Sequence, residues 1–179
     1  ADAQAKGQIS MPSPLTSGAA LIHTATLTDN AAFGWDYFEA LADNEAQAQG
    51  GNGGMLKAVA GGEKMYGVIV DFLPIREKAK GAPVEFVFPK EGVTYVTEPV
   101  AILNTAKNVD AAKAFIDFLL SDAGQKVAVD MGYMPAKAGI TPPAGFPKLE
   151  DIKLMAFDPA KALKDEEANK KKFAEIFGM

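Results

Sequence analysis

Small and hydroxyl-bearing residues follow the first strand-like segment, and their chemistry suits either helix capping or anion binding. Residues 8–11 predict a strand, and two prolines then mark a turn. Thr16, Ser17 and Gly18 come directly before a helix expected over residues 19–27. Ser and Thr are preferred N-cap residues. The open N–H groups and the positive dipole end of a helix also suit an anion, so both interpretations stay open at this point.

Two further polar side chains stand where loops open into predicted helices. Asn52 lies in the glycine-dense segment 47–54, ahead of a helix expected over 55–60. Glycine lets a backbone approach a ligand closely and serves equally in a plain turn, and no Lys-Ser or Lys-Thr pair follows to make a P-loop. Asp71 follows the apolar run 65–70, a predicted buried strand. It is either a helix N-cap or a site residue at the carboxyl end of that strand.

Catalytic and metal-binding patterns are weak in this sequence. The chain has one histidine, His23, and no cysteine, so neither a zinc site nor a cysteine nucleophile is expected. No Gly-x-Ser-x-Gly motif occurs. We therefore expect no resident metal or cofactor and no enzymatic activity. A polar small-molecule binder is the favoured class, and a small hydrolase or transferase that uses Asp71 is the alternative.

The elements that must position these residues predict an α/β fold. A helix is expected over 32–42, and strands over 65–70 and 84–88 flank a helix over 72–80, which implies a parallel pair with a crossover. Residues 93–103 form an extended stretch that could bridge two domains. Helices are expected over 108–120, 121–131 and 159–177. The expected buried positions are Ala112, Phe115, Ile116 and Leu119 in the first of these helices, and Phe173, Ile176 and Phe177 in the last.

Composition limits the kinds of partner. The chain has 179 residues, 48% of them hydrophobic, and a net charge of -5, which disfavours a nucleic-acid surface. No apolar run is long enough to span a bilayer. The lack of cysteine suits an extracytoplasmic protein. Because the sequence opens on Ala1 and not on Met, we expect that a leader has been removed or that this is a piece of a longer protein.

Several segments together resemble one family. Residues 7–18, GQISMPSPLTSG, resemble the K-I-x-x-x-x-P-x-x-S-G motif of type 2 periplasmic solute-binding proteins of ABC importers. Residues 60–63 and 89–92 are similar to that family's A-x-G-E and P-x-E-G motifs. Residues 106–121, AKNVDAAKAFIDFLLS, resemble its K-N-P-E-A-A-K-x-F-I-D-F-L-L-S segment. These segments occur in the same order as in the family. The branch that they resemble includes ferric-iron, hexose-phosphate and phosphonate binders.

This resemblance implies a three-layer α/β/α lobe with a helical remnant of a second lobe. Residues 1–96 would form the second lobe of the binding protein, nearly complete. Residues 97–179 would supply the hinge return strand and the C-terminal helical part of the first lobe. A complete member is longer, so we expect association with the missing N-terminal half or with a second copy of the chain, possibly as a dimer. The implied location is the periplasm, and the implied partner is the membrane permease of the importer.

The resemblance also implies a class of ligand. Ferric binders of this family use adjacent tyrosines near the central strand, and residues 66–72 hold no Tyr-Tyr pair. A small anionic solute, a phosphorylated sugar or a phosphonate, fits better, with its phosphate on Thr16, Ser17 and Gly18. Asp71 and Glu98 would accept hydrogen bonds from sugar hydroxyls. The remaining candidate ligand-binding residues are Ser13 and Asn52, and a ferric-iron binder is the alternative.

Overall fold

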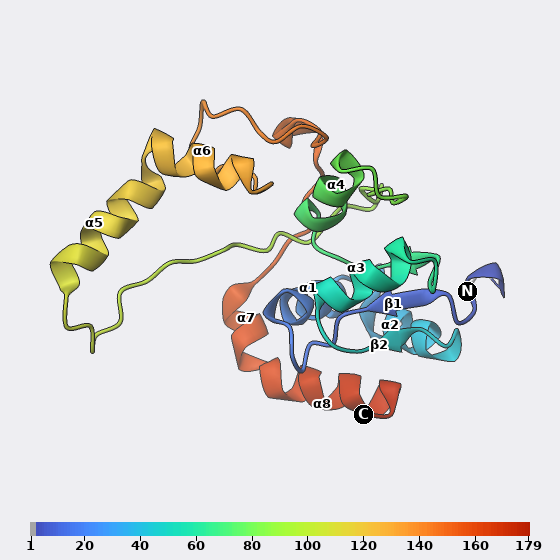
Figure 1. Ribbon diagram of the computed structural model, residues 1–179. Coiled ribbons are helices and arrows are strands. Elements are labelled where there is room, and N and C mark those ends of the chain that lie inside the picture. The colour runs from blue at the N-terminus through green and yellow to red at the C-terminus, as the bar shows by residue number, and fades with distance from the viewer. Residues whose placement is uncertain (1–2) are drawn as a thin grey trace. The chain divides into compact units, whose positions relative to one another are not determined.

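The computed structural model describes residues 3–179, other than the side chain of Leu149. The chain divides into two units, drawn together in Figure 1. The first unit comprises the residues up to Val96 together with Ile152–Met179, and the second comprises Thr97–Asp151. The chain therefore passes from one unit to the other twice.

A small parallel sheet forms the centre of the first unit. Its central strand is β1 (Ile9–Met11), flanked by β2 (Gln47–Ala48) and β3 (Tyr66–Gly67) in the order β2-β1-β3. Ser10 lies opposite Gln47 on one side and Gly67 on the other. Each flanking strand is parallel to β1, so all three carboxyl ends meet at one edge of the sheet.

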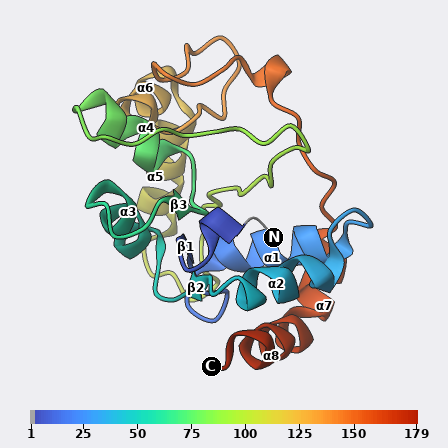
Figure 2. The same cartoon turned by 90° about the vertical axis from the view of Figure 1, so that its right-hand side faces the viewer.

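Helices cover both faces of this sheet (Figure 2). On one side pack α1 (Gly18–Asp29), α2 (Gly34–Asp43) and α8 (Glu166–Phe177), and on the other α3 (Asn52–Ala60). The first unit also contains α4 (Phe72–Ala79), α7 (Pro159–Lys164) and a 3₁₀ turn at Ala3–Ala5. The core on the α1 side is apolar, and its buried side chains include Met11, Leu27, Phe38, Ala48 and Phe173.

Close approach on the α3 side depends on a glycine in β3. A Cβ atom built on Gly67 would lie 2.3 Å from the Met55 sulfur and 3.1 Å from a methyl carbon of Val59. Both contacts are shorter than ordinary van der Waals separation, so a side chain here would force the Met55 and Val59 side chains to move. The absent side chain thus lets Met55, which is 3% exposed, pack directly against the strand.

The second unit consists mainly of two helices, α5 (Val109–Leu120) and α6 (Asp122–Asp130), with a 3₁₀ turn at Leu149–Asp151. Both expected N-caps are confirmed: the Asn108 side chain accepts a hydrogen bond from the Ala111 N–H, and Ser121 accepts one from Gly124. Gly124 also makes the corner between the helices possible, because a Cβ there would lie 2.1 Å from the Phe118 carbonyl oxygen.

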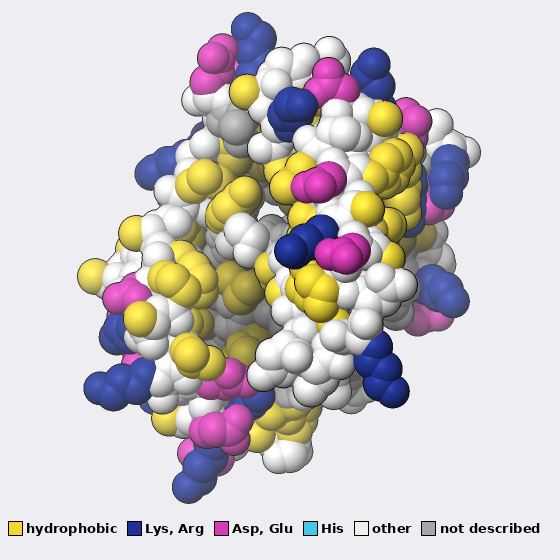
Figure 3. Space-filling model, turned by 90° about the vertical axis from the view of Figure 1, so that its left-hand side faces the viewer, with side chains coloured by type: hydrophobic (Ala, Val, Ile, Leu, Met, Phe, Trp, Pro, Cys, Tyr) yellow, Lys and Arg dark blue, Asp and Glu magenta, His cyan; other side chains and the backbone are white. Residues whose placement is uncertain are grey.

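Apolar side chains of the second unit remain open to solvent. Phe115 is 59% exposed. Each of four further residues is about half exposed: Phe118, Leu120, Val127 and Met131. Figure 3, which views the side of the molecule where α5 is drawn in Figure 1, shows hydrophobic side chains spread over the surface. The expectation that Phe115 occupies a core position is therefore wrong for the part of the chain that the structure describes. Within the second unit, α5 packs against α6, and the described residues of this unit include no strand.

The expected α/β class with a parallel sheet is confirmed, but some elements differ from the prediction. The strand expected at 65–70 is reduced to Tyr66–Gly67, and residues 84–88 form no strand. In that segment, exposure still alternates residue by residue, with Val87 72% exposed. A strand needs a paired neighbour to satisfy its backbone groups, and none of the described residues pairs with 84–88. The crossover pair expected between 65–70 and 84–88 is therefore wrong.

The C-terminal helix and the extended stretch 93–103 also differ from the prediction. The helix expected at 159–177 is two helices, because Asp165 ends α7 and begins α8. The extended stretch 93–103 forms a single bridge, between Val93 and Leu154. The units divide after Val96, close to the expected boundary, although residues 152–179 pack with the first unit. The assignment of 1–96 and 97–179 to two lobes stays a prediction.

Candidate functional site

Three strand–loop–helix connections meet at the carboxyl edge of the sheet. β1 leads into α1, β2 leads into α3 and β3 leads into α4, so three helix N-termini follow three parallel strand ends. In open parallel sheets, ligands bind beyond these strand ends. All but one of the residues proposed from sequence lie on these three connections, and the exception is Glu98.

The loop after β1 is tied to the loop after β2 through one carbonyl group. The Gly50 carbonyl oxygen accepts hydrogen bonds from the Ser13 backbone N–H and from the Thr16 hydroxyl, both at 3.2 Å. The Ser13 hydroxyl accepts a hydrogen bond from the Leu15 N–H at 3.2 Å, and Ser13 is 3% exposed. Ser13 and Thr16 thus stabilise the conformation of the loop after β1, and the Thr16 hydroxyl donates its hydrogen bond to the loop after β2.

Ser17 is the N-cap of α1, as one of the two sequence interpretations expected. Its side-chain oxygen accepts a hydrogen bond from the Ala20 N–H at 3.3 Å. Among the described residues, the N–H groups of Gly18 and Ala19 find no hydrogen-bond acceptor. A Cβ built on Gly18 would meet no atom within 4 Å, so the start of the helix is open. Capping and an available pair of N–H donors therefore occur together here.

Asn52 connects the second and third loops. Its side-chain oxygen accepts a hydrogen bond from the Val70 N–H at 3.2 Å, which fixes the start of α3 to the segment leaving β3. The two amide N–H donors of Asn52 have no acceptor among the described residues. The structure therefore brings Asn52 beside the segment that carries Asp71, a link between distant residues that sequence spacing does not show.

Asp71 caps α4 and is partly buried. Its Oδ1 accepts a hydrogen bond from the Phe72 N–H at 2.8 Å. Burial raises the pKa of the Asp71 carboxyl above its usual value, and the bonds to backbone N–H groups oppose that rise without cancelling it. A carboxylate that has lost part of its hydration is well suited to accept hydrogen bonds from a ligand's hydroxyl or ammonium groups.

Glu98, the seventh candidate, belongs to the second unit and is exposed. The six candidates Ser13, Thr16, Ser17, Gly18, Asn52 and Asp71 all belong to the first unit. The described contacts link Ser13, Thr16 and Ser17 through one loop, and Asn52 to the residue before Asp71. A role for Glu98 beside them stays a prediction.

His23 has a more specific environment than its sequence context indicated. Its Nδ1 lies 3.2 Å from the Thr94 hydroxyl, and its Nε2 is buried without a partner among the described residues. Burial lowers the pKa of His23 to about 4, so the ring is neutral at pH 7. Its place among Leu21, Ile22 and Leu27 was the one available signal of burial, and nothing in the sequence pointed to Thr94.

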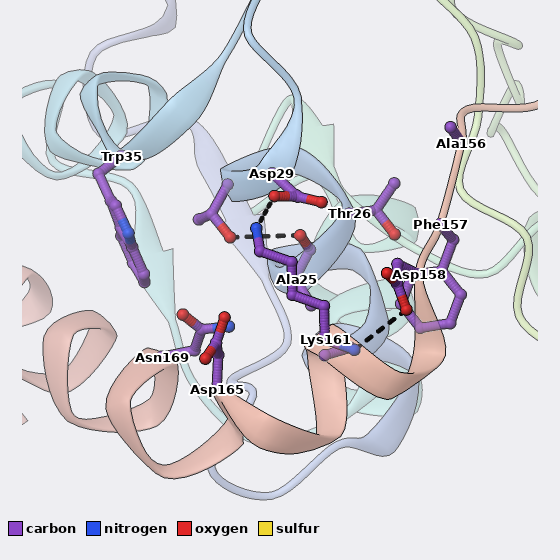
Figure 4. A pocket seen from close by; sticks show the side chains of 12 residues that line it. Ala25, Thr26, Asp29, Trp35, Ala156, Phe157, Asp158, Lys161, Asp165 and Asn169 are labelled. Carbon is purple, nitrogen blue, oxygen red and sulfur yellow. Dashed lines mark hydrogen bonds and ion pairs between the residues drawn. The ribbon is translucent and has the colours of Figure 1, made fainter.

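A second hollow lies at the opposite end of α1 (Figure 4). Asp29, Trp35, Lys161, Asp165 and Asn169 are among the side chains that line it. Lys161 is engaged in an ion pair with Asp29, and its backbone N–H donates to the Asp158 cap of α7. Lys161, Asp29 and Asp158 are thus engaged with one another or with the start of α7, and the sequence candidates lie elsewhere.

The described residues 3–179 contain neither a cluster of metal-binding side chains nor a membrane-spanning helix. In that range, no three His, Cys, Asp or Glu side chains are grouped so as to hold a metal ion. None of the helices described there is long and apolar enough to cross a membrane.

Comparison with known proteins assigns the chain to a family. Residues 1–164 match the family described as bacterial extracellular solute-binding protein. The chain belongs to this family of solute-binding proteins. A structural match with a TM-score of 0.71 and 16% sequence identity is the substrate-binding protein of an ABC transporter from Agrobacterium tumefaciens, which shares the fold.

Two sequence relatives add detail. An uncharacterized protein of Haemophilus influenzae is 34% identical over 135 residues, which are 73% of this chain and 38% of that protein. The spermidine/putrescine-binding periplasmic protein of Escherichia coli is 36% identical over 73 residues, which are 40% of this chain and 21% of that protein. The Agrobacterium match covers 97% of this chain and 55% of its own chain. The matched part of this chain therefore spans between 21% and 55% of the length of these relatives.

Proposed function

We propose that this chain contributes to the solute-binding component of an ABC importer, and that the carboxyl edge of its sheet binds a small anionic solute. The observation that carries the proposal is that three helix N-termini follow the strand ends at this edge, where the N–H groups of Gly18 and Ala19 have no acceptor among the described residues. Such N–H groups and the helix dipole favour a phosphate or phosphonate group. Asn52 supplies further donors, and Asp71 accepts hydrogen bonds from hydroxyl groups of the same solute.

The remaining parts of the proposal follow from the family. The location is the periplasm, and the partner is the membrane permease of the importer. Residues 1–96 act as the second lobe, and 97–179 act as the hinge return and part of the first lobe. The exposed apolar face of α5 pairs with the rest of a longer chain or with a second copy. Size-exclusion chromatography that finds a stable monomer with no partner bound would contradict this last point.

A matched pair of capping variants tests the anion site. Ser17 and Ser121 are both N-cap serines, with N–H to Oγ distances of 3.3 and 3.2 Å, but only Ser17 lies at the carboxyl edge of the sheet. Replacing either by Ala removes a cap and costs about 1 kcal/mol of stability. In calorimetric titration with a sugar phosphate, we expect Ser17→Ala to weaken binding about tenfold and Ser121→Ala to leave it unchanged. Equal losses would count against the site.

A polyamine is the second candidate solute. It is favoured by the local identity to a spermidine/putrescine-binding protein and by the desolvated carboxyl of Asp71. The two solutes respond in opposite ways to Asp71→Asn. Removing the negative charge should weaken spermidine binding at least about tenfold, whereas binding of an anion should hold or improve. A thermal-shift panel of sugar phosphates, phosphonates, spermidine and ferric salts gives the first separation, and stabilisation by iron alone would contradict both candidates.

A further inference from the structure

Two segments of the first unit lead into the second unit, and they are hydrogen-bonded to each other. The chain leaves the first unit after Val96 and returns at Ile152. Close to these points, the Val93 N–H donates to the Lys153 carbonyl and the Met155 N–H donates to the Val93 carbonyl, both at 2.9 Å. Val93 and Leu154 form a parallel bridge as a result. The outgoing and returning segments therefore lie side by side within the first unit.

Gly92 permits this close pairing. Its φ of +120° is a conformation that L side chains rarely adopt. A Cβ at this position would lie 3.1 Å from the Lys153 carbonyl oxygen and 3.3 Å from Cγ of Met155. The backbone of one segment thus rests directly on the other.

One side-chain contact joins this bridge to a core helix. Thr94 follows the bridged residue, and its hydroxyl lies 3.2 Å from Nδ1 of His23 on α1. Nε2 of His23 is buried and has no partner in the described part of the chain, so the contact with Thr94 is the one hydrogen bond found for this ring. α1 itself is held in the core, where Leu27 is 3% exposed.

We propose that His23 and Thr94 anchor the paired connecting segments to α1, so that the two segments behave as one stiff hinge. A bridge of two hydrogen bonds is marginal by itself, because short isolated pairs of strands do not hold together in water. Fixing Thr94 to a rigid helix lowers the freedom of the neighbouring Val93 and preserves the bridge. His23 is a positioning residue in this arrangement and touches no ligand.

Amide hydrogen exchange tests the anchor without any ligand, so its outcome is independent of the proposed function. Thr94→Val keeps the shape of the side chain and removes the hydroxyl, whereas Thr94→Ser keeps the hydroxyl. We expect the Val93 and Met155 amides to exchange about three- to tenfold faster in Thr94→Val and at the native rate in Thr94→Ser. Unchanged exchange in Thr94→Val would overturn the proposal. An equal acceleration at Gln49 and Val68, whose amides bond to β1, would show general destabilisation and would overturn it as well.

The histidine side of the contact has its own readout. The ¹⁵N resonance of His23 Nδ1 should shift in Thr94→Val and stay in place in Thr94→Ser, because only the first variant loses the hydroxyl partner. His23→Asn retains a polar group near the position of Nδ1 and should keep the slow exchange of Val93, whereas His23→Leu should lose it. If His23→Leu fails to fold, the two Thr94 variants still decide the matter. Slow exchange in a folded His23→Leu would contradict the anchor.

Discussion

The two units of this chain differ in what they bury. In the first unit, Phe38 and Phe173 are fully buried with their ring centroids 5.6 Å apart. In the second unit, the buried residues among those described are Gly124 and Gln125, neither of them apolar. The first unit encloses a hydrophobic core. In the second unit, the buried side chain is that of Gln125, which is polar.

The difference teaches what an amphipathic pattern does and does not encode. Both α2 and α5 carry apolar residues at helical spacing. Phe38 of α2 is 0% exposed because α1 and α8 pack against it, whereas Phe115 of α5 is 59% exposed. The pattern states that a face requires a partner, and it does not state which segment supplies it.

Truncating one phenylalanine in each unit should give the largest contrast. We expect Phe38→Ala to cost about 3–5 kcal/mol of unfolding free energy, because it empties a closed core. In the unpaired chain, Phe115→Ala should cost less than about 1 kcal/mol, since its ring is already largely hydrated there. Urea unfolding followed by circular dichroism measures both values. Comparable losses would mean that α5 is covered in solution.

Acid should weaken the first unit specifically, through His23. Its pKa is about 4 in the folded state and 6.5 in the unfolded state, so the unfolded chain binds more protons between these values. Stability is then full above pH 6.5 and falls by about 3 kcal/mol as the pH drops to 4. Other carboxyl groups titrate in this range, so the wild type is compared with His23→Asn in urea titrations at each pH. An identical pH dependence in the variant would contradict the assignment.

Gln125 should be the residue on which the second unit depends most. Its Nε2 donates to the Leu119 carbonyl at 2.8 Å, and its Oε1 accepts from the Ala136 N–H at 2.7 Å. Gln125→Leu leaves both backbone groups without partners and should cost about 2 kcal/mol. Hydrogen exchange of the Ala136 amide reports the loss directly. The control is Lys126→Ala on the exposed side of α6, which should leave that exchange rate unchanged.

The smallest effect expected is a gain. The Thr24 hydroxyl is buried, and it makes no hydrogen bond among the described residues. Thr24→Val removes this polar group at constant shape and should stabilise the first unit by about 1 kcal/mol. Thr26 is equally buried but donates to the Ile22 carbonyl at 2.8 Å, so Thr26→Val should destabilise. Thermal melts of the two variants that move in the same direction would contradict this distinction.

Sequence reasoning recovered what local chemistry determines. Capping chemistry located the starts of α1 and α5, at Ser17 and Asn108. Apolar periodicity located α2, whose start has no side-chain cap. The docking residue Phe173 was also predicted and is fully buried. These features depend on residues a few positions apart, which a single sequence displays directly.

Features set by distant partners were not recovered. Residues 84–88 keep the alternation of a strand but lack a paired neighbour, so the pattern was right and the element was wrong. In the candidate site, the residues were named from sequence, but the bonds from Thr16 to Gly50 and from Val70 to Asn52 were not. The contact between His23 and Thr94 spans 71 positions, and no local pattern records it.

The aromatic cluster beside α8 contains the tryptophan whose fluorescence can be followed during unfolding. Trp35 is the single tryptophan, and its ring lies 5.8 Å from Phe38, with the Lys172 ammonium 5.0 Å from its centre. Its emission therefore follows the environment of the first unit alone, while far-ultraviolet ellipticity sums the helices of both. If the two units unfold separately, the tryptophan emission and the far-ultraviolet ellipticity will give different unfolding curves. The difference between the two curves will then report the unfolding of α5 and α6.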